Sequence, residues 1–449
     1  MVEPQARTDR LYGLLALAVA TAAFALRFKG VWFGYPLAVH PDEGYLVYRA
    51  LRMIQLGDLN PHFFNYPSLN FYLLAALFEG VALWNRLILG VSNVASIPEI
   101  DFFIAGRILV VLISTATVYV TYEMGRRMIH PVAGLAAAAL IAPAFLHVSN
   151  SFVVTVDSPV ALWSSLAALM AVLIFTDGGK RRYYVLSGVF AGLAVGSKYT
   201  GLLGALPLVI AHLLVAKRNG SLLNKDIAIG LLAVPITFLL TTPYAVLDYE
   251  GFRGSVSLEE AHYSTGHAGA ESSTSTSFLP YAKVLALEGY GVLPMLLSLA
   301  GALWLSAKDY RMALILLSFP LCLFLFVGQY KVFFVRNLVA VVPFLALCGG
   351  IFLCQLLGWL KHWVSRRLAT RWCSATAYGV VAVLLCVSVC GQLVRSYRYV
   401  RHINLPDTRV ASLLWITENL PPGSRIGREH YTPPVEQLTD DYEVVYLGY

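Results

Sequence analysis

The sequence predicts an all-α polytopic membrane protein, and three observations support this class. Of the 449 residues, 58% are hydrophobic and only 13% are charged, which lies outside the range of ordinary soluble domains. Continuous apolar runs, such as residues 11–28, 102–124 and 374–394, are long enough to cross a hydrocarbon core of roughly 30 Å as helices. These runs do not alternate between polar and apolar residues, so they do not describe a membrane β-barrel.

Basic residues gather in the short loops between the apolar runs, and they predict the sidedness of the chain. Loops rich in Lys and Arg face the cytoplasm, so we expect a multi-pass protein of the inner (plasma) membrane with a cytoplasmic N-terminus. This topology also accounts for the net charge of +7, and we expect the lipid bilayer and no nucleic acid as a partner. The clusters are Arg7 with Arg10, Arg126 with Arg127, Lys180 to Arg182, Lys217 with Arg218 and Lys225, Lys308 with Arg311, and residues 361–371.

The apolar runs between these clusters predict about eleven spanning helices. A further apolar run, residues 66–89, would move every later basic loop to the other side if it crossed the membrane. We therefore expect it to form a juxtamembrane helix on the outer face, although loop charge is a bias that leaves a twelfth span open. The predicted spans are residues 11–28, 102–124, 132–147, 159–175, 184–196, 201–215, 227–243, 284–305, 312–327, 337–359 and 374–394.

This topology divides the chain into a membrane domain, residues 1–394, and an outward C-terminal module, residues 395–449. The first outer loop covers residues 29–101. In the module, the composition turns soluble after residue 407 and predicts a short α/β unit, with a helix at 408–419 and strand-like pieces at 424–428 and 442–447. The module is too small to hold a core of its own, so we expect it either to dock on the membrane domain or to begin a longer one.

Three acidic residues fall in the predicted outer loops. Asp42 and Glu43 lie in the sequence His-Pro-Asp-Glu-Gly-Tyr directly after the first apolar run, and Asp157 follows in a later loop. Ionisable groups at a membrane surface are candidates for function, and a carboxylate can take a proton from an attacking hydroxyl. Two alternatives stay open: a solvated turn at Pro41-Asp42, and a helix N-cap at Asp157.

Four basic residues on the same predicted face are candidates for binding a phosphate group. Lys198 lies between two apolar runs, and Lys331 and Arg336 share a polar loop near residue 330. Arg107 lies near the outer end of its helix, where it would either pair with an acid or hold a lipid phosphate. The alternative for the lysines and for Arg336 is snorkelling towards lipid headgroups.

His262 and His267, which follow Glu259 and Glu260, form the one cluster that resembles a metal site. A five-residue gap is weak evidence for a metal, so hydrogen bonding to substrate or solvent exposure is the preferred interpretation. No nucleotide-binding fingerprint is present in the sequence. We expect no cofactor, with a divalent cation left open.

In combination, several motifs resemble a known family. They are an apolar helix that ends in Arg27, HPDEGY at 40–45, FNYPSL at 64–69, GLAVGSKYTGLL at 192–203, and a late Arg336 followed by a Val-Pro-Phe run. The order resembles the C-type (GT-C) glycosyltransferase fold. It is most similar to the bacterial branch of the protein mannosyltransferase superfamily, which includes lipid A aminoarabinose transferases and rhizobial galacturonosyl transferases. The resemblance extends from Arg27 to about Phe344.

The resemblance implies a membrane glycosyltransferase that transfers a sugar, with inversion, from a polyprenyl-phosphate donor. The acceptor would be a hydroxyl of a lipid, glycan or protein on the outer, periplasmic or extracellular, side. Asp42 would be the base, supported by Glu43 and Asp157, and the donor phosphate would lie near Lys198 and Arg336, with Arg107 and Lys331 further candidates. Residues expected to contact substrate are His40, Tyr66, Tyr199, His262 and His267.

A membrane transporter or lipid flippase is the alternative function. Transport sites usually lie near the middle of the bilayer, between internal repeats with broken helices. Here the unusual charges gather at one predicted surface and no repeat is evident. The sequence therefore favours transfer chemistry over transport.

Overall fold

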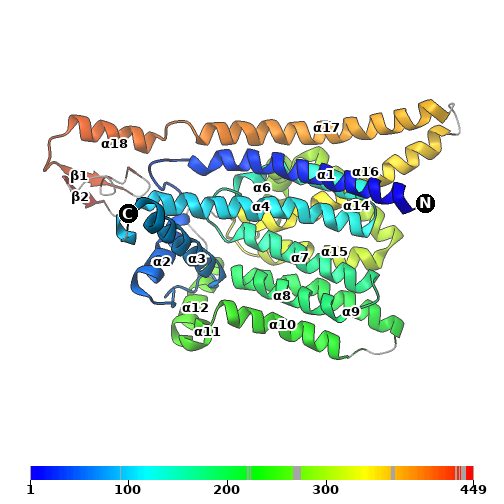
Figure 1. The fold of residues 1–449 in the computed structure, drawn as a ribbon, viewed down its shortest axis with the longest axis horizontal. Helices are drawn as coiled ribbons and strands as arrows, with labels where there is room; N and C mark the ends of the chain where they lie inside the picture. The colour runs from blue at the N-terminus through cyan, green and yellow to red at the C-terminus, as the bar shows by residue number, and fades with distance from the viewer. Residues whose placement is uncertain are drawn as a thin grey trace.

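The chain forms a bundle of long helices with a small module at one end. The structure is a computed structural model, and it describes residues 2–91, 93–219, 222, 224–265, 275–365, 370–429, 432–433, 435 and 441–447. The long helices run roughly along the longest dimension of the molecule (Figure 1). The N-terminus lies at one end of this bundle, and the loop helices and C-terminal strands lie at the other (Figure 1).

Each of the eleven predicted spans corresponds to helical structure. Two of them begin with 3-10 segments, η4 (Tyr199–Ala205) before α9 and η6 (Val335–Val341) before α16. The spans are α1 (Val2–Phe28), α4 (Glu99–Met128), α5 (Pro131–Ile141) with α6 (Phe145–Ser149), α7 (Asp157–Thr176), α8 (Arg181–Ser197), α9 (Leu206–Asn219), α10 (Lys225–Thr241), α14 (Val292–Lys308), α15 (Tyr310–Gly328), α16 (Val342–Ser365) and α17 (Thr370–Ile403).

By length and apolarity alone, 8 helices of the described residues could cross a membrane, or up to 9 if a pair bent by 117° is counted as one span. The stricter count includes α14 only as part of the bent pair, and it leaves out α5, which has 11 residues, and α8 and α10, which have 17 each. At 1.5 Å per residue, a helix of that length covers about 25 Å, near the lower limit for a span. Helix α3 (Leu69–Trp84) passes the count together with η2 (Asn85–Leu89). It nevertheless lies beside α2 at the end of the bundle (Figure 1), as expected for the run at 66–89.

Small residues allow the central helices to approach closely. A side chain at Gly134 in α5 would meet the backbone of Tyr122 in α4, and one at Gly188 in α8 would meet the backbone of Gly230 in α10. Close contact through small residues is the usual packing of membrane helices, because hydrophobic burial does not drive their association in lipid. Outward-facing leucines remain exposed, as on α1, where Leu14 and Leu17 are more than half exposed. This apolar surface fits a surrounding bilayer.

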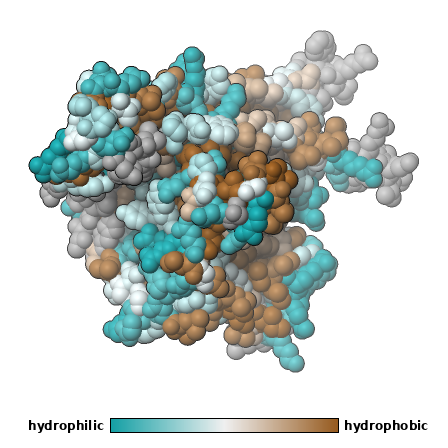
Figure 2. Space-filling view, turned by 60° about the vertical axis from the view of Figure 1, so that its left-hand side comes forward, coloured by the Kyte–Doolittle hydropathy of each residue, from teal (hydrophilic) through white to brown (hydrophobic). Residues whose placement is uncertain are grey.

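The loops at the end of the bundle opposite the N-terminus contain short helices. The first loop has η1 (Lys29–Trp32), α2 (Glu43–Leu56), α3, η2 and η3 (Val94–Ser96). A later loop supplies α11 (Tyr244–Leu247), α12 (Tyr249–Thr265), α13 (Phe278–Val284) and η5 (Leu285–Gly289). When this end is turned forward, its surface mixes hydrophilic residues with hydrophobic patches (Figure 2).

The C-terminal module docks on the first loop. It contains α18 (Thr408–Asn419) and a parallel pair of strands, β1 (Arg425–Arg428) and β2 (Glu443–Tyr446), close to the predicted positions. Leu413 and Val435 pack with Leu37 of the first loop in one small apolar cluster. Helix α17 continues past residue 394, the expected domain boundary, as far as Ile403.

Candidate active site

A cavity of about 870 Å³ lies at the end of the bundle that carries the loop helices. Its walls come from parts of the chain that are far apart in the sequence: the first loop and α2, the α8–η4 junction, α12, and Phe334 with the start of η6. The residues that line it are His40, Pro41, Asp42, Gly44, Tyr45, Tyr48, Arg49, Phe63, Asn65, Tyr66, Lys198, Glu259, Tyr263, Phe334 and Arg336. The cavity therefore brings together five of the predicted residues, which are His40, Asp42, Tyr66, Lys198 and Arg336.

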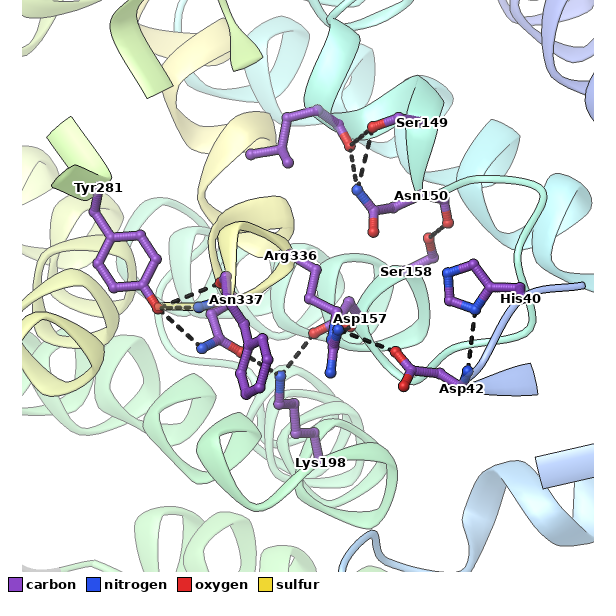
Figure 3. A network of polar contacts seen from close by, with 12 residues as sticks. His40, Asp42, Ser149, Asn150, Asp157, Ser158, Lys198, Tyr281, Arg336 and Asn337 are labelled. Atoms are coloured by element: carbon purple, nitrogen blue, oxygen red, sulfur yellow. Dashed lines mark hydrogen bonds and ion pairs between the residues drawn. The ribbon is translucent and has the colours of Figure 1, made fainter. Parts of the chain in front are cut away.

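Asp42 is placed in this cavity by the start of α2. It is the N-cap residue of the helix, and its backbone N–H donates to His40 Nδ1 at 3.2 Å. Its carboxylate Oδ2 lies 3.0 Å from Arg336 Nη1 (Figure 3). This ion pair links the first loop to the segment that precedes α16, and it leaves the Asp42 side chain partly exposed to the cavity, at 21%.

Asp157 is buried behind Asp42 and contacts two cations. Its Oδ1 accepts a hydrogen bond from Lys198 Nζ at 2.7 Å, and its Oδ2 lies 3.8 Å from Arg336 Nε (Figure 3). Its side chain is only 4% exposed. It is the first residue of α7, and the N-cap position belongs to Val156, with no side-chain cap. The N-cap alternative for Asp157 is therefore wrong, and the carboxylate instead holds the two basic groups.

Lys198 follows the C-terminal end of α8, where the chain passes into η4. Its ammonium also donates to Asn337 Oδ1 at 2.7 Å, and Asn337 Nδ2 donates to the Tyr281 hydroxyl at 3.2 Å (Figure 3). Burial opposes the charge of Lys198, but the neighbouring Asp157 carboxylate outweighs it and raises the lysine pKa. Lys198 is thus a fixed cation at neutral pH.

Glu43 and Arg107 form a buried ion pair outside the cavity. Arg107 Nε and Nη2 donate to the two carboxylate oxygens of Glu43 at 2.9 and 2.7 Å, and both side chains are 0% exposed. Arg107 Nη1 also donates to the Val31 and Phe33 carbonyls, and Glu43 Oε1 accepts from the Val154 N–H. Of the two roles expected for Arg107, the structure shows pairing with an acid.

The burial of Glu43 follows from the helical period of α2. Glu43, Leu46, Val47 and Ala50 share one buried face of the helix, at the spacing of one amphipathic stripe. Asp42 lies outside this stripe. The two adjacent acids therefore point in different directions, and neither Glu43 nor Arg107 lines the cavity.

The other predicted substrate contacts are only partly brought together. Tyr66 lines the cavity, and burial raises its pKa to about 12. Tyr199 does not line this cavity, and its hydroxyl donates to the Phe64 carbonyl at 2.6 Å. Lys331 is exposed and does not line the cavity. The side chain of His262 and the whole of His267 lie outside the described residues.

Asn337, Arg49 and Glu259 belong to the site but were not predicted as site residues. Asn337 directly follows Arg336 in the sequence, and this adjacency to a predicted site residue could have identified it as a candidate. Glu259 accepts a hydrogen bond from Asn65 Nδ2 at 3.0 Å, and this contact joins two loops whose proximity no sequence pattern indicates. Within the described part of the chain, no group of three or more His, Cys, Asp or Glu residues could hold a metal ion.

A second, more apolar cavity of about 420 Å³ adjoins the first. The two share Asn65, Tyr66, Lys198, Glu259 and Tyr263. The remaining wall of the second cavity comes mainly from η4, α12 and the end of α15 and is formed by Tyr199, Thr200, Leu202, Leu203, Val256, Glu260, Phe326 and Tyr330. A polar cavity with fixed charges thus opens beside an apolar one, and Lys198 lines both.

Comparisons with known proteins agree with this architecture. Residues 101–246 match a family model described as dolichyl-phosphate-mannose-protein mannosyltransferase. No curated protein matches the chain.

Solved structures resemble the chain over most of its length. The structure of ArnT from Cupriavidus metallidurans bound to undecaprenyl phosphate matches with a TM-score of 0.64 at 16% identity, over 97% of this chain and 85% of that one. The archaeal oligosaccharyltransferase AglB from Archaeoglobus fulgidus, in complex with an inhibitory peptide and a dolichol-phosphate, matches with a TM-score of 0.58 at 13% identity. That match covers 90% of this chain and 58% of AglB.

These findings confirm the resemblance that the motifs indicated. The family match begins at the third residue of α4 and ends in α11, so it includes Arg107, Asp157 and Lys198. The structural matches extend the similarity to the first loop and the later helices. The chain is a multi-pass membrane protein with the GT-C glycosyltransferase fold, and its segment 101–246 matches the protein mannosyltransferase family model.

Proposed function

We propose that this protein transfers a sugar from a polyprenyl-phosphate donor to an acceptor hydroxyl, with inversion at the anomeric carbon. The observation that carries the proposal is the chain of ion pairs Asp42–Arg336–Asp157–Lys198 beside two connected cavities, one polar and one apolar. The mannosyltransferase family match supports a glycosyltransferase. The polyprenyl phosphates in the ArnT and AglB structures support this class of donor.

In this mechanism Asp42 is the general base. The acceptor hydroxyl attacks the anomeric carbon, its proton passes to an Asp42 carboxylate oxygen, and the bond between the anomeric carbon and the phosphate oxygen breaks. The electron pair of that bond leaves with the polyprenyl phosphate. Asp42 is suited to this role because its partly exposed carboxylate borders the larger cavity.

Lys198 and Arg336 stabilise the charge that develops on the leaving phosphate. Both line the larger cavity, and Lys198 also lines the apolar one, into which the donor tail would extend. Charge-assisted hydrogen bonds to phosphate oxygens are short and strong, and fixed donors are effective where charge appears in the transition state. Asp157 holds both cations in position, so its role is to orient them.

Glu43 and Arg107 act as positioning residues. Their buried pair connects η1, the start of α2, α4 and the loop before α7. These segments carry Asp42 on one side and Asp157 on the other, so the pair fixes the separation of the two site acids. In this mechanism Glu43 takes no direct part in the reaction and Arg107 does not bind the phosphate, in contrast to the roles that the sequence suggested.

The site would face the periplasm or the outside of the cell. The basic clusters at Arg126 with Arg127 and at Lys180 to Arg182 lie at the ends of α4 and at the start of α8, opposite the end that carries α2 and α3 (Figure 1). Positive loops mark the cytoplasmic side, and this arrangement supports a cytoplasmic N-terminus. Residues 1–394 would then hold the catalytic site, with the module after 394 covering part of its outer rim.

The direct test is single-turnover transfer. Purified protein in nanodiscs would be incubated with a labelled undecaprenyl-phosphate sugar and a panel of hydroxyl acceptors, and the anomeric configuration of the product would be read by NMR. We expect a new glycosidic bond of inverted configuration. Movement of the donor across the bilayer without bond formation would instead favour a flippase.

A further inference from the structure

Helix α2 presents a second functional face to the larger cavity. Tyr45, Tyr48 and Arg49 line the cavity from this helix, on the side opposite to its buried stripe. The Arg49 guanidinium carbon lies 4.0 Å from the centroid of the Phe63 ring, and its Nη1 donates to the Tyr45 carbonyl at 3.1 Å. Packing against an aromatic face restricts the orientation of a guanidinium. Arg49 is therefore a partly buried cation held at the wall of the cavity.

Arg49 differs from the other cations of the cavity in its charge balance. Lys198 and Arg336 each have carboxylate partners, whereas no ion pair involves Arg49 among the described residues. Burial lowers the pKa of Arg49, with a smaller contribution from Arg52 and against an opposing one from Tyr45. A desolvated cation without a counterion is costly. A bound anion would offset this cost.

The position of Arg49 separates it from the donor end of the site. The apolar cavity shares Asn65, Tyr66 and Lys198 with the larger one but includes no residue of α2. A donor whose tail lies there would approach from the Lys198 side, which leaves the α2 side for the acceptor. Arg49 follows Asp42 by seven residues, which corresponds to about 10 Å along a helix axis.

From this geometry we propose that Arg49 is the binding site for an anionic group, a phosphate or a carboxylate, on the acceptor. The inference rests on the proposed function and adds the chemical class of the acceptor to it. The reacting hydroxyl lies at Asp42, and the anionic group lies about two helical turns away, about 10 Å along α2. The planar guanidinium offers paired N–H donors that match either anion.

Equilibrium binding tests this site without requiring turnover. The full chain in nanodiscs, loaded with undecaprenyl phosphate, would be titrated with methyl β-D-glucuronide, methyl glucoside 6-phosphate and neutral methyl glucoside, and Kd would be measured by saturation-transfer NMR. We expect Kd for at least one anionic glycoside to be about tenfold lower than for the neutral one. The arm that shows the preference identifies the anion as carboxylate, phosphate or both.

Variants assign the preference to one side chain. Arg49→Gln should remove the preference, while Arg49→Lys should keep part of it because the charge remains. Arg52→Gln is the matched control, since Arg52 is exposed on the same helix and does not line the cavity. Retained binding of undecaprenyl phosphate would show that the Arg49 variants are folded.

Three results would overturn the inference: equal affinities in the wild-type protein, a preference that survives in Arg49→Gln, or loss of undecaprenyl phosphate binding in that variant and in Arg49→Lys. The third would place Arg49 at the donor. Transfer is measured separately with the same glycosides. An anion preference without transfer would keep the anion site and reject the proposed function, so the two failures are distinguishable.

Discussion

Asp42 and Arg336 form an ion pair in the wall of the cavity, with Oδ2 and Nη1 3.0 Å apart, although one is the N-cap of α2 in the first loop and the other lies in η6. The contact brings the proposed base next to a proposed phosphate-binding cation. A base must lie close to both the attacking hydroxyl and the bond that breaks. This one pair therefore connects the two halves of the proposed reaction.

Replacement of Asp42 by Asn should stop transfer while donor binding persists. The amide keeps the size of the side chain but cannot accept the proton, so we expect kcat to fall by about 10² to 10⁴. Labelled-sugar transfer gives kcat, and undecaprenyl phosphate binding reports the integrity of the site. Glu79→Gln is a suitable control, because Glu79 is an exposed acid of the same loop. Near wild-type kcat in Asp42→Asn would refute the base assignment.

Replacement of Lys198 by Met should affect stability as well as the donor. It removes the 2.7 Å partner of a carboxylate that is 4% exposed and leaves it only Arg336 at 3.8 Å, and loss of one partner of a buried charge costs up to about 3 kcal/mol. The double variant Asp157→Asn with Lys198→Met should regain much of this stability but not transfer. SDS-titration unfolding and donor KM would be measured in parallel. Equal destabilisation in the single and double variants would contradict the pairing argument.

Replacement of Arg107 by Gln distinguishes positioning from phosphate binding. The substitution leaves Glu43 buried without its bidentate partner, so we expect the free energy of unfolding to fall by about 3 kcal/mol. Folded protein, stabilised at low temperature, should retain wild-type affinity for undecaprenyl phosphate. A selective loss of that affinity with unchanged stability would instead support phosphate binding by Arg107.

The pKa of His40 predicts how stability depends on pH. Burial lowers this pKa below the ordinary value of 6.5, and Arg336 and Arg107 add to the effect against the opposing charges of Glu43 and Asp42. The unfolded chain then binds the proton more readily than the folded one, so stability is lost as the pH falls below about 6.5. Protonation also removes the Nδ1 acceptor of the Asp42 N–H.

Comparison with His40→Asn gives the measurement. The wild-type protein should lose stability relative to this variant between about pH 6.5 and pH 4.5, since the two proteins differ only in the imidazole at position 40 that the wild type can protonate. Unfolding free energies would be determined across that range. Parallel curves for the two proteins would exclude His40 as the titrating group.

Replacement of Leu203 by Trp tests the apolar cavity. The larger side chain would occupy part of the 420 Å³ space where the donor tail is proposed to lie. We expect KM for a long-chain polyprenyl-phosphate sugar to rise about tenfold, because burial of each methylene contributes roughly 0.8 kcal/mol. KM for a short, soluble-chain donor should change little. Equal effects on both donors would argue against this location for the tail.

Much of the fold could be predicted from the sequence because, in a bilayer, the local composition of each segment largely decides whether it spans the membrane. Apolar runs define spans, and loop charge defines sides. The juxtamembrane placement of residues 66–89 followed from charge alone, and α3 lies at the end of the bundle in the structure (Figure 1). Asp42, Lys198 and Arg336 were identified by the same means, as charges on one predicted face.

Contacts between distant loops were decided only by tertiary structure. The resemblance assigned Asp42 as the base and Glu43 as its support, but only the fold shows that Asp42 faces the cavity while Glu43 is buried against Arg107. The helical period of α2 favours that division, but only packing against α4 supplies the buried partner. In the same way, Asn65 and Glu259 meet because two loops converge. Sequence thus determined which segments cross the membrane and which charges reach its surface, whereas folding determined which charges neutralise one another and which, like Arg49, stay available.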